Sequence, residues 1–98
     1  MRFLVIISSP RMLRHVLRLA SAAHEKGHTV TVFFNEAPVK LLADPGAVMG
    51  LDAEMLACVT AGQESGVKDE DLVEGARFTS LGEVVALIKE CDRTLFLG

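Results

Sequence analysis

Residues 3–7, Phe-Leu-Val-Ile-Ile, and residues 28–34, His-Thr-Val-Thr-Val-Phe-Phe, decide the fold of this 98-residue chain. The first run is continuously apolar and rich in β-branched side chains, as in a strand buried on both faces of a parallel sheet. Between the runs, apolar side chains recur at helical spacing from Leu13 to Ala23, with Ser9-Pro10 before them and Gly27 after them. The stretch therefore predicts a β-α-β unit with a helix over about residues 10–26 and a right-handed crossover.

The same alternation of strand and helix continues to the end of the chain. A short helix is expected from Glu36 to Leu42 and a turn at Asp44-Pro45-Gly46. Residues 53–61 fit either a strand or a helix. The strands that we expect are residues 54–59, 76–79 and 93–97. Since no linker or internal repeat interrupts the pattern, we expect one three-layer α/β domain over residues 1–98.

Two capped helical segments are expected in the second half of the chain. Asp69 is suited to cap a helical turn over residues 70–74, and Ser80 is suited to cap the last helix. That helix is predicted to bury one side, formed by Val84, Val85, Leu87 and Ile88. Met49 and Met55 are expected to fill the core.

Composition narrows the classes of partner. Half of the residues are hydrophobic and the mean hydropathy is +0.36, so apolar surface should remain for a neighbouring subunit to cover. We therefore expect an oligomer. The net charge is −3 and the chain has neither Trp nor Tyr, which argues against direct binding of nucleic acid.

Membrane and export signals are not predicted. The apolar run at residues 3–7 is too short to span a bilayer and ends at Ser8-Ser9-Pro10, without the cleavage pattern of a signal peptide. We expect a cytoplasmic protein that does not bind membranes. The two cysteines, Cys58 and Cys91, do not make a disulfide framework, and cytosolic thiols stay reduced unless they have redox or catalytic work.

Phosphate and anion sites receive little support from the sequence. No phosphate-binding or dinucleotide fingerprint is present, because the loop after the first strand holds Ser8-Ser9-Pro10 in place of glycines. Arg11, Arg14 and Arg18 fall on one side of the first helix. Arg11 and Arg14 are thus candidates for contact with an anion or an acidic partner, and a solvated helix face is the alternative.

Metal and hydrolase sites are not predicted either. His24 and His28 are four residues apart, but Gly27 should end the helix between them, and no Cys or acidic cluster completes a ligand set. No Ser-His-Asp arrangement or carboxylate pair is placed by the expected elements. We expect no metal and no cofactor.

Cys58 is the candidate nucleophile. It ends an apolar run and is followed by Val59-Thr60-Ala61-Gly62, which would set the thiol at the carboxyl end of a strand, near unpaired backbone N–H groups. Thr60 could add a hydroxyl donor. No Lys or Arg lies within nine residues of Cys58, so positive charge would have to come from a partner. The alternative is that Cys58 is a small buried apolar residue, as we expect for Cys91.

Short motifs along nearly the whole chain resemble the DsrE-like family, which includes the sulfur-relay subunits DsrE and TusD. The motifs are Met1-Arg2-Phe3, Gly27-His28, Val32-Phe33-Phe34, Cys58, Gly66-Val67, Gly75-Ala76-Arg77-Phe78-Thr79 and Cys91-Asp92-Arg93. Two features depart from TusD. The segment before Cys58 is shorter, and Gln63-Glu64-Ser65 replaces the basic residues that follow the TusD cysteine.

The resemblance implies a three-layer α/β/α fold with a mostly parallel five-stranded sheet, and assembly into trimers or hexamers of identical or different chains. It also implies that Cys58 carries sulfane sulfur as a persulfide between sulfur donor and acceptor proteins, with no metal or organic cofactor. We therefore hypothesise a cytoplasmic sulfur-relay protein, acting as a carrier or a sulfurtransferase. The alternative is a non-catalytic binding or scaffold subunit of the same fold.

Overall fold

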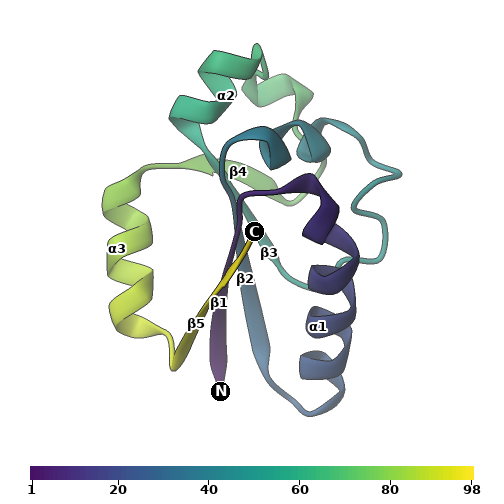
Figure 1. Ribbon diagram of the computed structural model, residues 1–98, viewed down its shortest axis with the longest axis vertical. Helices are drawn as coiled ribbons and strands as arrows, with labels where there is room; N and C mark the ends of the chain where they lie inside the picture. Colours follow the sequence, from purple (N-terminus) through teal and green to yellow (C-terminus); the bar gives the residue numbers. More distant parts are fainter.

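The computed structural model describes residues 1–98 and contains one parallel sheet of five strands in the order β4-β3-β2-β1-β5 (Figure 1). The strands are β1 Arg2–Ile7, β2 Thr29–Phe34, β3 Glu54–Cys58, β4 Ala76–Thr79 and β5 Arg93–Leu97. All four strand pairs are parallel. The predicted α/β/α fold class and all five predicted strands are confirmed.

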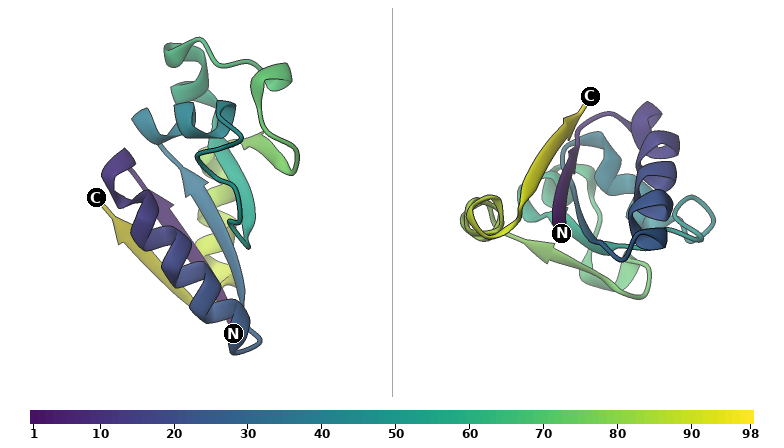
Figure 2. Two further views of the ribbon diagram at one scale, coloured as in Figure 1. Left: turned by 90° about the vertical axis from the view of Figure 1, so that its right-hand side faces the viewer. Right: turned by 90° about the horizontal axis from the view of Figure 1, so that it is seen from below.

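Three α-helices connect the strands, together with three short 3-10 helices. The α-helices are α1 Leu13–Glu25, α2 Val59–Ser65 and α3 Leu81–Glu90, and the 3-10 helices are η1 Pro10–Met12, η2 Ala37–Ala43 and η3 Asp69–Asp71. Helices α1 and α3 lie on opposite faces of the sheet, whereas α2 lies beyond the carboxyl ends of the strands (Figures 1 and 2). None of these helices has the length and apolar character that a membrane span requires.

Helix α1 ends as the sequence predicts but begins differently. Gly27 adopts a left-handed conformation with φ of 79°, and the N–H of His28 donates to the carbonyl of Ala23 at 2.9 Å. This is the six-residue bond that closes a glycine-terminated helix. At the other end, Ser9 makes no side-chain cap, and a 3-10 turn precedes the α-helix.

The core lies on both faces of the three central strands. Fully buried side chains come from β1, β2 and β3, and α1 contributes Val16 and Ala20 from one face. The η2 segment adds Val39 and Leu42, both fully buried, at the carboxyl end of the strands. The carboxyl ends of β2 and β3 are thus buried from solvent beneath η2 and α2.

Three expectations about individual side chains are wrong. Val85 and Ile88 of α3 are 51% and 41% exposed, because α3 packs on the sheet only through Val84 and Leu87. Met49 is 76% exposed and lies in the loop before β3, which covers the core through its neighbour Val48. Apolar character alone does not say which flank of an element meets the core.

Two predicted turns have different outcomes. Asp69 does not act as a cap; it begins η3, and the carboxylate of Asp71 accepts a hydrogen bond from the N–H of Lys68 at 2.9 Å. The predicted turn at residues 44–46 is confirmed, with the Gly46 N–H donating to the Asp44 carboxylate at 3.1 Å.

Candidate functional site

Cys58 is the last residue of β3 and the residue that caps α2. The chain turns there from an apolar strand into Val59-Thr60-Ala61, and the N–H of Ala61 donates to the Cys58 sulfur at 3.5 Å. The predicted position of the thiol, at a strand end with a backbone donor, is thus what the structure shows. A sulfur that accepts an N–H bond is better placed to bear negative charge.

Cys58 is nearly covered by the rest of the chain. The residue keeps 8% of its exposure, while Val59 beside it is 38% exposed and Thr60 is also exposed. The Thr60 hydroxyl makes no hydrogen bond, although Thr60 lies in the first turn of α2. The residues that follow Cys58 in the first turn of α2 are thus open to solvent, whereas Cys58 itself is buried.

The strand next to Cys58 carries a polar network that the sequence did not predict. Thr79 of β4 is the register partner of Cys58 and is 5% exposed. Its hydroxyl donates to the carboxylate of Glu83 on α3, and the same carboxylate accepts bonds from the Arg77 guanidinium at 2.7 and 3.2 Å. The network fixes the start of α3 against β4, next to the thiol.

The charges of this network are strongly coupled. Hydrogen bonds from Arg77 and then from Thr79 lower the pKa of Glu83 to about 2, and the bond to Glu83 raises the pKa of Arg77. Glu83 is therefore ionised at neutral pH and its charge is neutralised locally by Arg77. The Ser80-x-x-Glu83 pattern of a capping box was the available sequence signal, and the Glu83 N–H does bond to the Ser80 hydroxyl at 3.3 Å.

Arg11 and Arg14 are not brought to Cys58. Arg11 lies in η1 after β1 and Arg14 in α1, both exposed and without an ion pair in the chain. Strand β2 and the η2 segment separate them from the end of β3. Their candidate role as contacts for an anion or an acidic partner stays a prediction.

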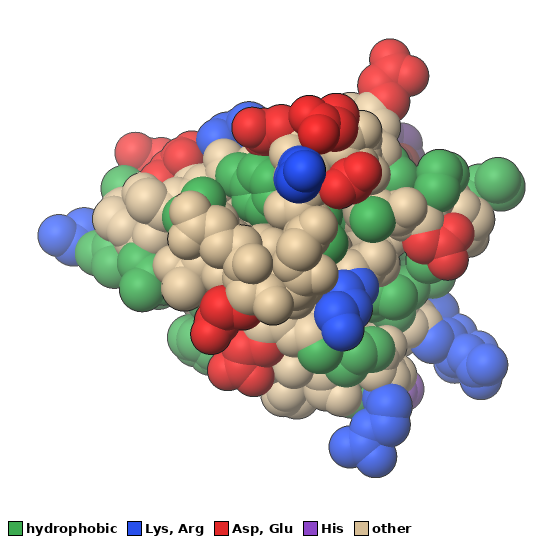
Figure 3. Space-filling view, turned by 90° about the horizontal axis from the view of Figure 1, so that it is seen from above, with side chains coloured by type: hydrophobic (Ala, Val, Ile, Leu, Met, Phe, Trp, Pro, Cys, Tyr) green, Lys and Arg blue, Asp and Glu red, His purple; other side chains and the backbone are tan.

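The segment that follows α2 is acidic. Residues 64–74 contain one Lys and five acidic residues: Glu64, Asp69, Glu70, Asp71 and Glu74. Seen onto the carboxyl ends of the strands, Asp and Glu side chains gather along the upper border, and Lys and Arg gather toward the lower right (Figure 3). The surface of the chain that follows α2 is therefore negatively charged.

Cys91 lies at the opposite end of the sheet, between α3 and the start of β5. It is half-buried, and burial raises the pKa of its thiol. Both cysteines are free. Cys91 is thus placed away from Cys58 and in a setting that favours the neutral thiol.

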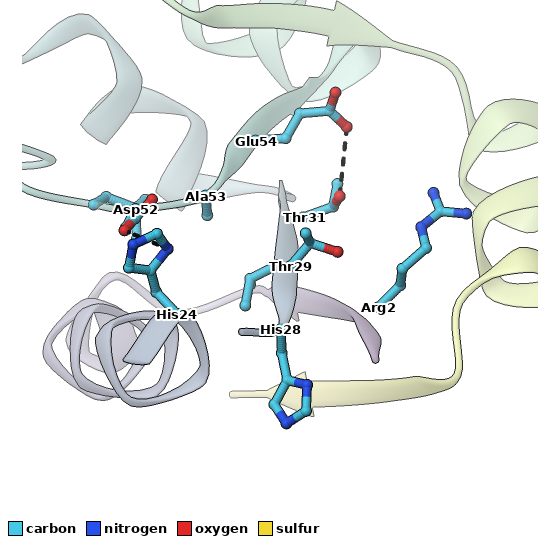
Figure 4. Close-up of a pocket in the computed structure, with 10 residues that line it drawn as sticks. Arg2, His24, His28, Thr29, Thr31, Asp52, Ala53 and Glu54 are labelled. Atoms are coloured by element: carbon cyan, nitrogen blue, oxygen red, sulfur yellow. Dashed lines mark hydrogen bonds and ion pairs between the residues drawn. The ribbon is translucent and has the colours of Figure 1, made fainter. Parts of the chain in front are cut away.

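A polar cavity of about 500 Å³ opens at the amino ends of the strands (Figure 4). His24 and Asp52 pair across its margin at 2.9 Å, and the Thr31 hydroxyl donates to Glu54 at 3.4 Å, while His28 points away and contacts the amino group of Met1 at 2.9 Å. No group of three His, Cys, Asp or Glu residues in the structure could hold a metal ion. The cavity lies away from Cys58.

Two solved structures share this fold. The YchN protein from E. coli is 18% identical with a TM-score of 0.77, over 99% of this chain and 100% of that chain. MTH1491 from Methanobacterium thermoautotrophicum, described as a protein of unknown function, is 21% identical with a TM-score of 0.78, over 97% of each chain. A comparison with curated proteins finds no match.

Fold and site together define an α/β protein with a parallel five-stranded sheet and a cysteine at the carboxyl end of β3. A sequence model of the DsrE/DsrF-like family matches residues 1–97. The chain belongs to the DsrE/DsrF-like family, which confirms the resemblance drawn from the motifs.

Proposed function

We propose that the chain is a cytoplasmic sulfur-relay protein that carries sulfane sulfur as a persulfide on Cys58, between a donor and an acceptor protein. The proposal rests on one observation above all. In a chain of the DsrE/DsrF-like family, Cys58 ends β3 and its sulfur accepts the Ala61 N–H. The same backbone donor would stabilise the sulfur anion that forms whenever Cys58 acts as nucleophile or leaving group.

The transfer needs only a donor persulfide, the Cys58 thiolate and an acceptor thiolate. The Cys58 thiolate attacks the outer sulfur of a donor persulfide, a new S–S bond forms to Cys58, and the donor S–S bond breaks to leave the donor as a thiolate. An acceptor thiolate then attacks the outer sulfur held on Cys58, and Cys58 departs as a thiolate. One sulfur atom moves in each step, with no net oxidation and no cofactor.

The charges around the site support a donor of a particular kind. The chain places carboxylates after α2 and no Lys or Arg within nine residues of Cys58. A donor or acceptor with basic residues beside its own thiol would be attracted to this segment and would favour ionised sulfur in the complex. We expect such partners to bind more weakly as the salt concentration rises.

The test is direct loading of sulfur. Purified protein is exposed to polysulfide, and intact-mass and peptide analysis locate any added sulfur atom. Wild type and Cys91→Ser should gain sulfur on Cys58, and Cys58→Ser should gain none. An added thiol should then remove the sulfur from Cys58. Equal loading of Cys58→Ser and wild type would contradict the proposal.

The rival function is a binding or scaffold subunit without sulfur chemistry. It is favoured by the 8% exposure of Cys58, which leaves little of the residue open to a donor. In that case Cys58 would resist polysulfide in the folded chain and gain sulfur only after denaturation. The trimeric or hexameric assembly implied by the family resemblance fits either function.

A further inference from the structure

Two polar residues lie beside Cys58 at the carboxyl ends of the neighbouring strands. Thr79 of β4 is the register partner of Cys58. In β2, the partner of Ala57 is the residue before Asn35, so Asn35 lies level with Cys58. The N–H of Asn35 donates to the carbonyl of Ile7 at 2.9 Å, so the hydrogen bonds between β2 and β1 extend to this residue. Neighbouring strands are about 4.7–4.9 Å apart, which makes Asn35 and Thr79 the two flanking residues of Cys58.

These three residues share the face of the sheet that α3 covers. Side chains two residues apart in a strand point to the same face, and Arg77 and Thr79 both bond to Glu83 of α3. Residues at the same level in neighbouring strands also point to one face. The Cys58 thiol and the Asn35 carboxamide therefore lie on the α3 side of the sheet.

Several directions around the Cys58 sulfur are already occupied. Toward β4, Thr79 is 5% exposed and its hydroxyl is bonded to α3. Toward α2, the Ala61 N–H contacts the sulfur at 3.5 Å. Toward the amino end of β3, Leu56 on the same face is fully buried. The β2 side differs, because Asn35 there is only half-buried, so an atom added to the sulfur has room on the Asn35 side.

The Asn35 carboxamide is free to bond to such an atom. It makes no hydrogen bond within the chain, whereas the Thr79 hydroxyl already donates its one proton to Glu83. Glu36, the next residue, has a φ of 56° and is the one residue other than glycine with a positive φ. This strained residue turns the chain out of the sheet directly after Asn35. Asn35 thus combines a fixed backbone with two unused N–H donors.

We propose that Asn35 is a second sulfur-binding residue, whose carboxamide N–H donates to the outer sulfur of the persulfide on Cys58. The Ala61 N–H bonds to the inner sulfur, so each sulfur atom of the pair has one donor. The outer sulfur carries the negative charge when the persulfide ionises, and hydrogen bonds to charged acceptors are the stronger ones. The inference rests on the proposed function, because it requires a persulfide on Cys58.

Neutral donors are needed at this position because the surrounding charge does not favour an anion. The ionisable side chains in β4, in η2 and its preceding residue, in α2 and in the first turn of α3 are Glu36, Lys40, Glu64, Arg77 and Glu83. Arg77 is paired with Glu83, which leaves two carboxylates and one ammonium group. An anion at Cys58 therefore depends on the N–H groups of Ala61 and Asn35.

The test compares the loaded and the unloaded thiol. The full chain carries Cys91→Ser, so that Cys58 is the one thiol, and is loaded with polysulfide. The Cys58 thiolate takes the terminal sulfur, and the polysulfide leaves one sulfur atom shorter. Alkylation with iodoacetamide over a range of pH, followed by peptide mass analysis, gives the pH midpoint of reaction for each form. Asn35→Ala and Asn35→Asp are the variants. Gln63→Ala is the matched control, because Gln63 presents the same amide in an exposed position on α2.

We expect Asn35→Ala to raise the pH midpoint of the loaded form by about one unit or more, which is a roughly tenfold loss of anion stabilisation. The midpoint of unloaded Cys58 should change little, since the inner sulfur keeps the Ala61 N–H. Asn35→Asp should raise the loaded midpoint further, because a carboxylate then faces the outer sulfur. Gln63→Ala should match the protein with Asn35 intact.

Circular dichroism verifies that each variant is folded. Folded Asn35 variants with an unchanged loaded midpoint would overturn this inference and leave the proposed function in place. An equal shift of the loaded and unloaded midpoints in Asn35→Ala would also overturn it, since Asn35 would then not distinguish the outer sulfur. If Cys58 takes up no sulfur with Asn35 intact, the inference and the proposed function both fail.

Discussion

Helices α1 and α3 cover opposite faces of the same sheet, but only α1 exposes a mainly polar surface to solvent. On α1, Val16 and Ala20 are fully buried, and the exposed positions are charged or polar apart from Ala22, with Arg14 and Arg18 among them. On α3, Val84 and Leu87 are buried, and the outward positions up to Ile88 are apolar or glycine. The apolar pattern of α1 is satisfied within one chain, and that of α3 is only half satisfied.

The difference teaches where the chain depends on contacts outside itself. Helix α1 packs on the sheet and exposes mainly polar side chains. Helix α3 begins beside Thr79, the register partner of Cys58, and exposes apolar side chains from that point on. The candidate site and the exposed apolar side chains of α3 thus lie at one helix.

The largest expected effect separates two neighbours on α3. Leu87 is 9% exposed and Ile88 is 41% exposed. We expect Leu87→Ala to lower the free energy of unfolding by about 2–3 kcal/mol, because it removes buried apolar volume. Ile88→Ala should lower it by less than about 1 kcal/mol. Urea unfolding at low protein concentration measures both, so that association contributes least. Equal losses would mean that α3 is packed on both of these sides in the single chain.

Next in size is a pair of glycines at the ends of the two helices. Gly27 closes α1 with φ of 79°, which alanine adopts poorly, so Gly27→Ala should cost about 1 kcal/mol. Gly82 lies in the first turn of α3 and has no left-handed φ, and an added Cβ would meet only the Ser80 hydroxyl at 3.7 Å. Gly82→Ala should therefore stabilise the chain by about 0.5 kcal/mol.

Thermal unfolding of both variants at one pH shows whether Gly27→Ala lowers the stability and Gly82→Ala raises it. The comparison fails if Gly27→Ala is neutral, since the end of α1 would then not require a left-handed residue. It also fails if Gly82→Ala is destabilising, since the outward side of α3 would then be tightly covered in the single chain.

A smaller effect concerns the polar network at the start of α3. The pKa of Glu83 in the folded chain is about 2, below the ordinary 4.5, because Arg77 and Thr79 bond to the carboxylate. A depressed pKa contributes stability above pH 4.5, and that stability is lost as the pH falls from 4.5 toward 2. The stability advantage of wild type over Glu83→Gln should therefore shrink over this range.

Melting temperatures of wild type and Glu83→Gln between pH 2 and pH 7 measure this difference, with the pH range set by the two pKa values. Glu64→Gln is the matched control, because Glu64 is exposed and makes no ion pair. We expect a modest effect, since the Arg77 and Glu83 side chains are 52% and 39% exposed. A pH-independent difference would show that Glu83 acts by shape and not by charge.

Much of the fold could be predicted from the sequence because its signals are local. The apolar run at residues 3–7, the helical spacing up to Ala23 and the glycine at position 27 each fix structure within a few residues. The position of Cys58 was predictable for the same reason, since an apolar strand followed by small residues marks a strand-to-helix turn.

The surroundings of Cys58 were not predictable in the same way. Thr79 becomes its neighbour only through the register of β3 and β4, and Glu83 reaches Thr79 only because α3 starts directly after β4. Val85 and Ile88 show the other limit. The pattern identifies apolar side chains, but how many flanks of α3 the single chain covers depends on the width of the whole sheet.

The smallest expected effect tests whether polar contacts matter equally at the two helices. His24 at the end of α1 pairs with Asp52 at 2.9 Å, and the two side chains are 67% and 52% exposed. Asp52→Asn should change the free energy of unfolding by less than about 0.5 kcal/mol, and 1 M salt should remove the difference. His24→Gln should behave alike, and a double-mutant cycle isolates the pair. A coupling energy above about 1 kcal/mol would instead mean that this ion pair fixes the loop around Val48 over the core. Helix α1 would then be held by a polar contact, as α3 is held by the hydrogen bonds of Glu83.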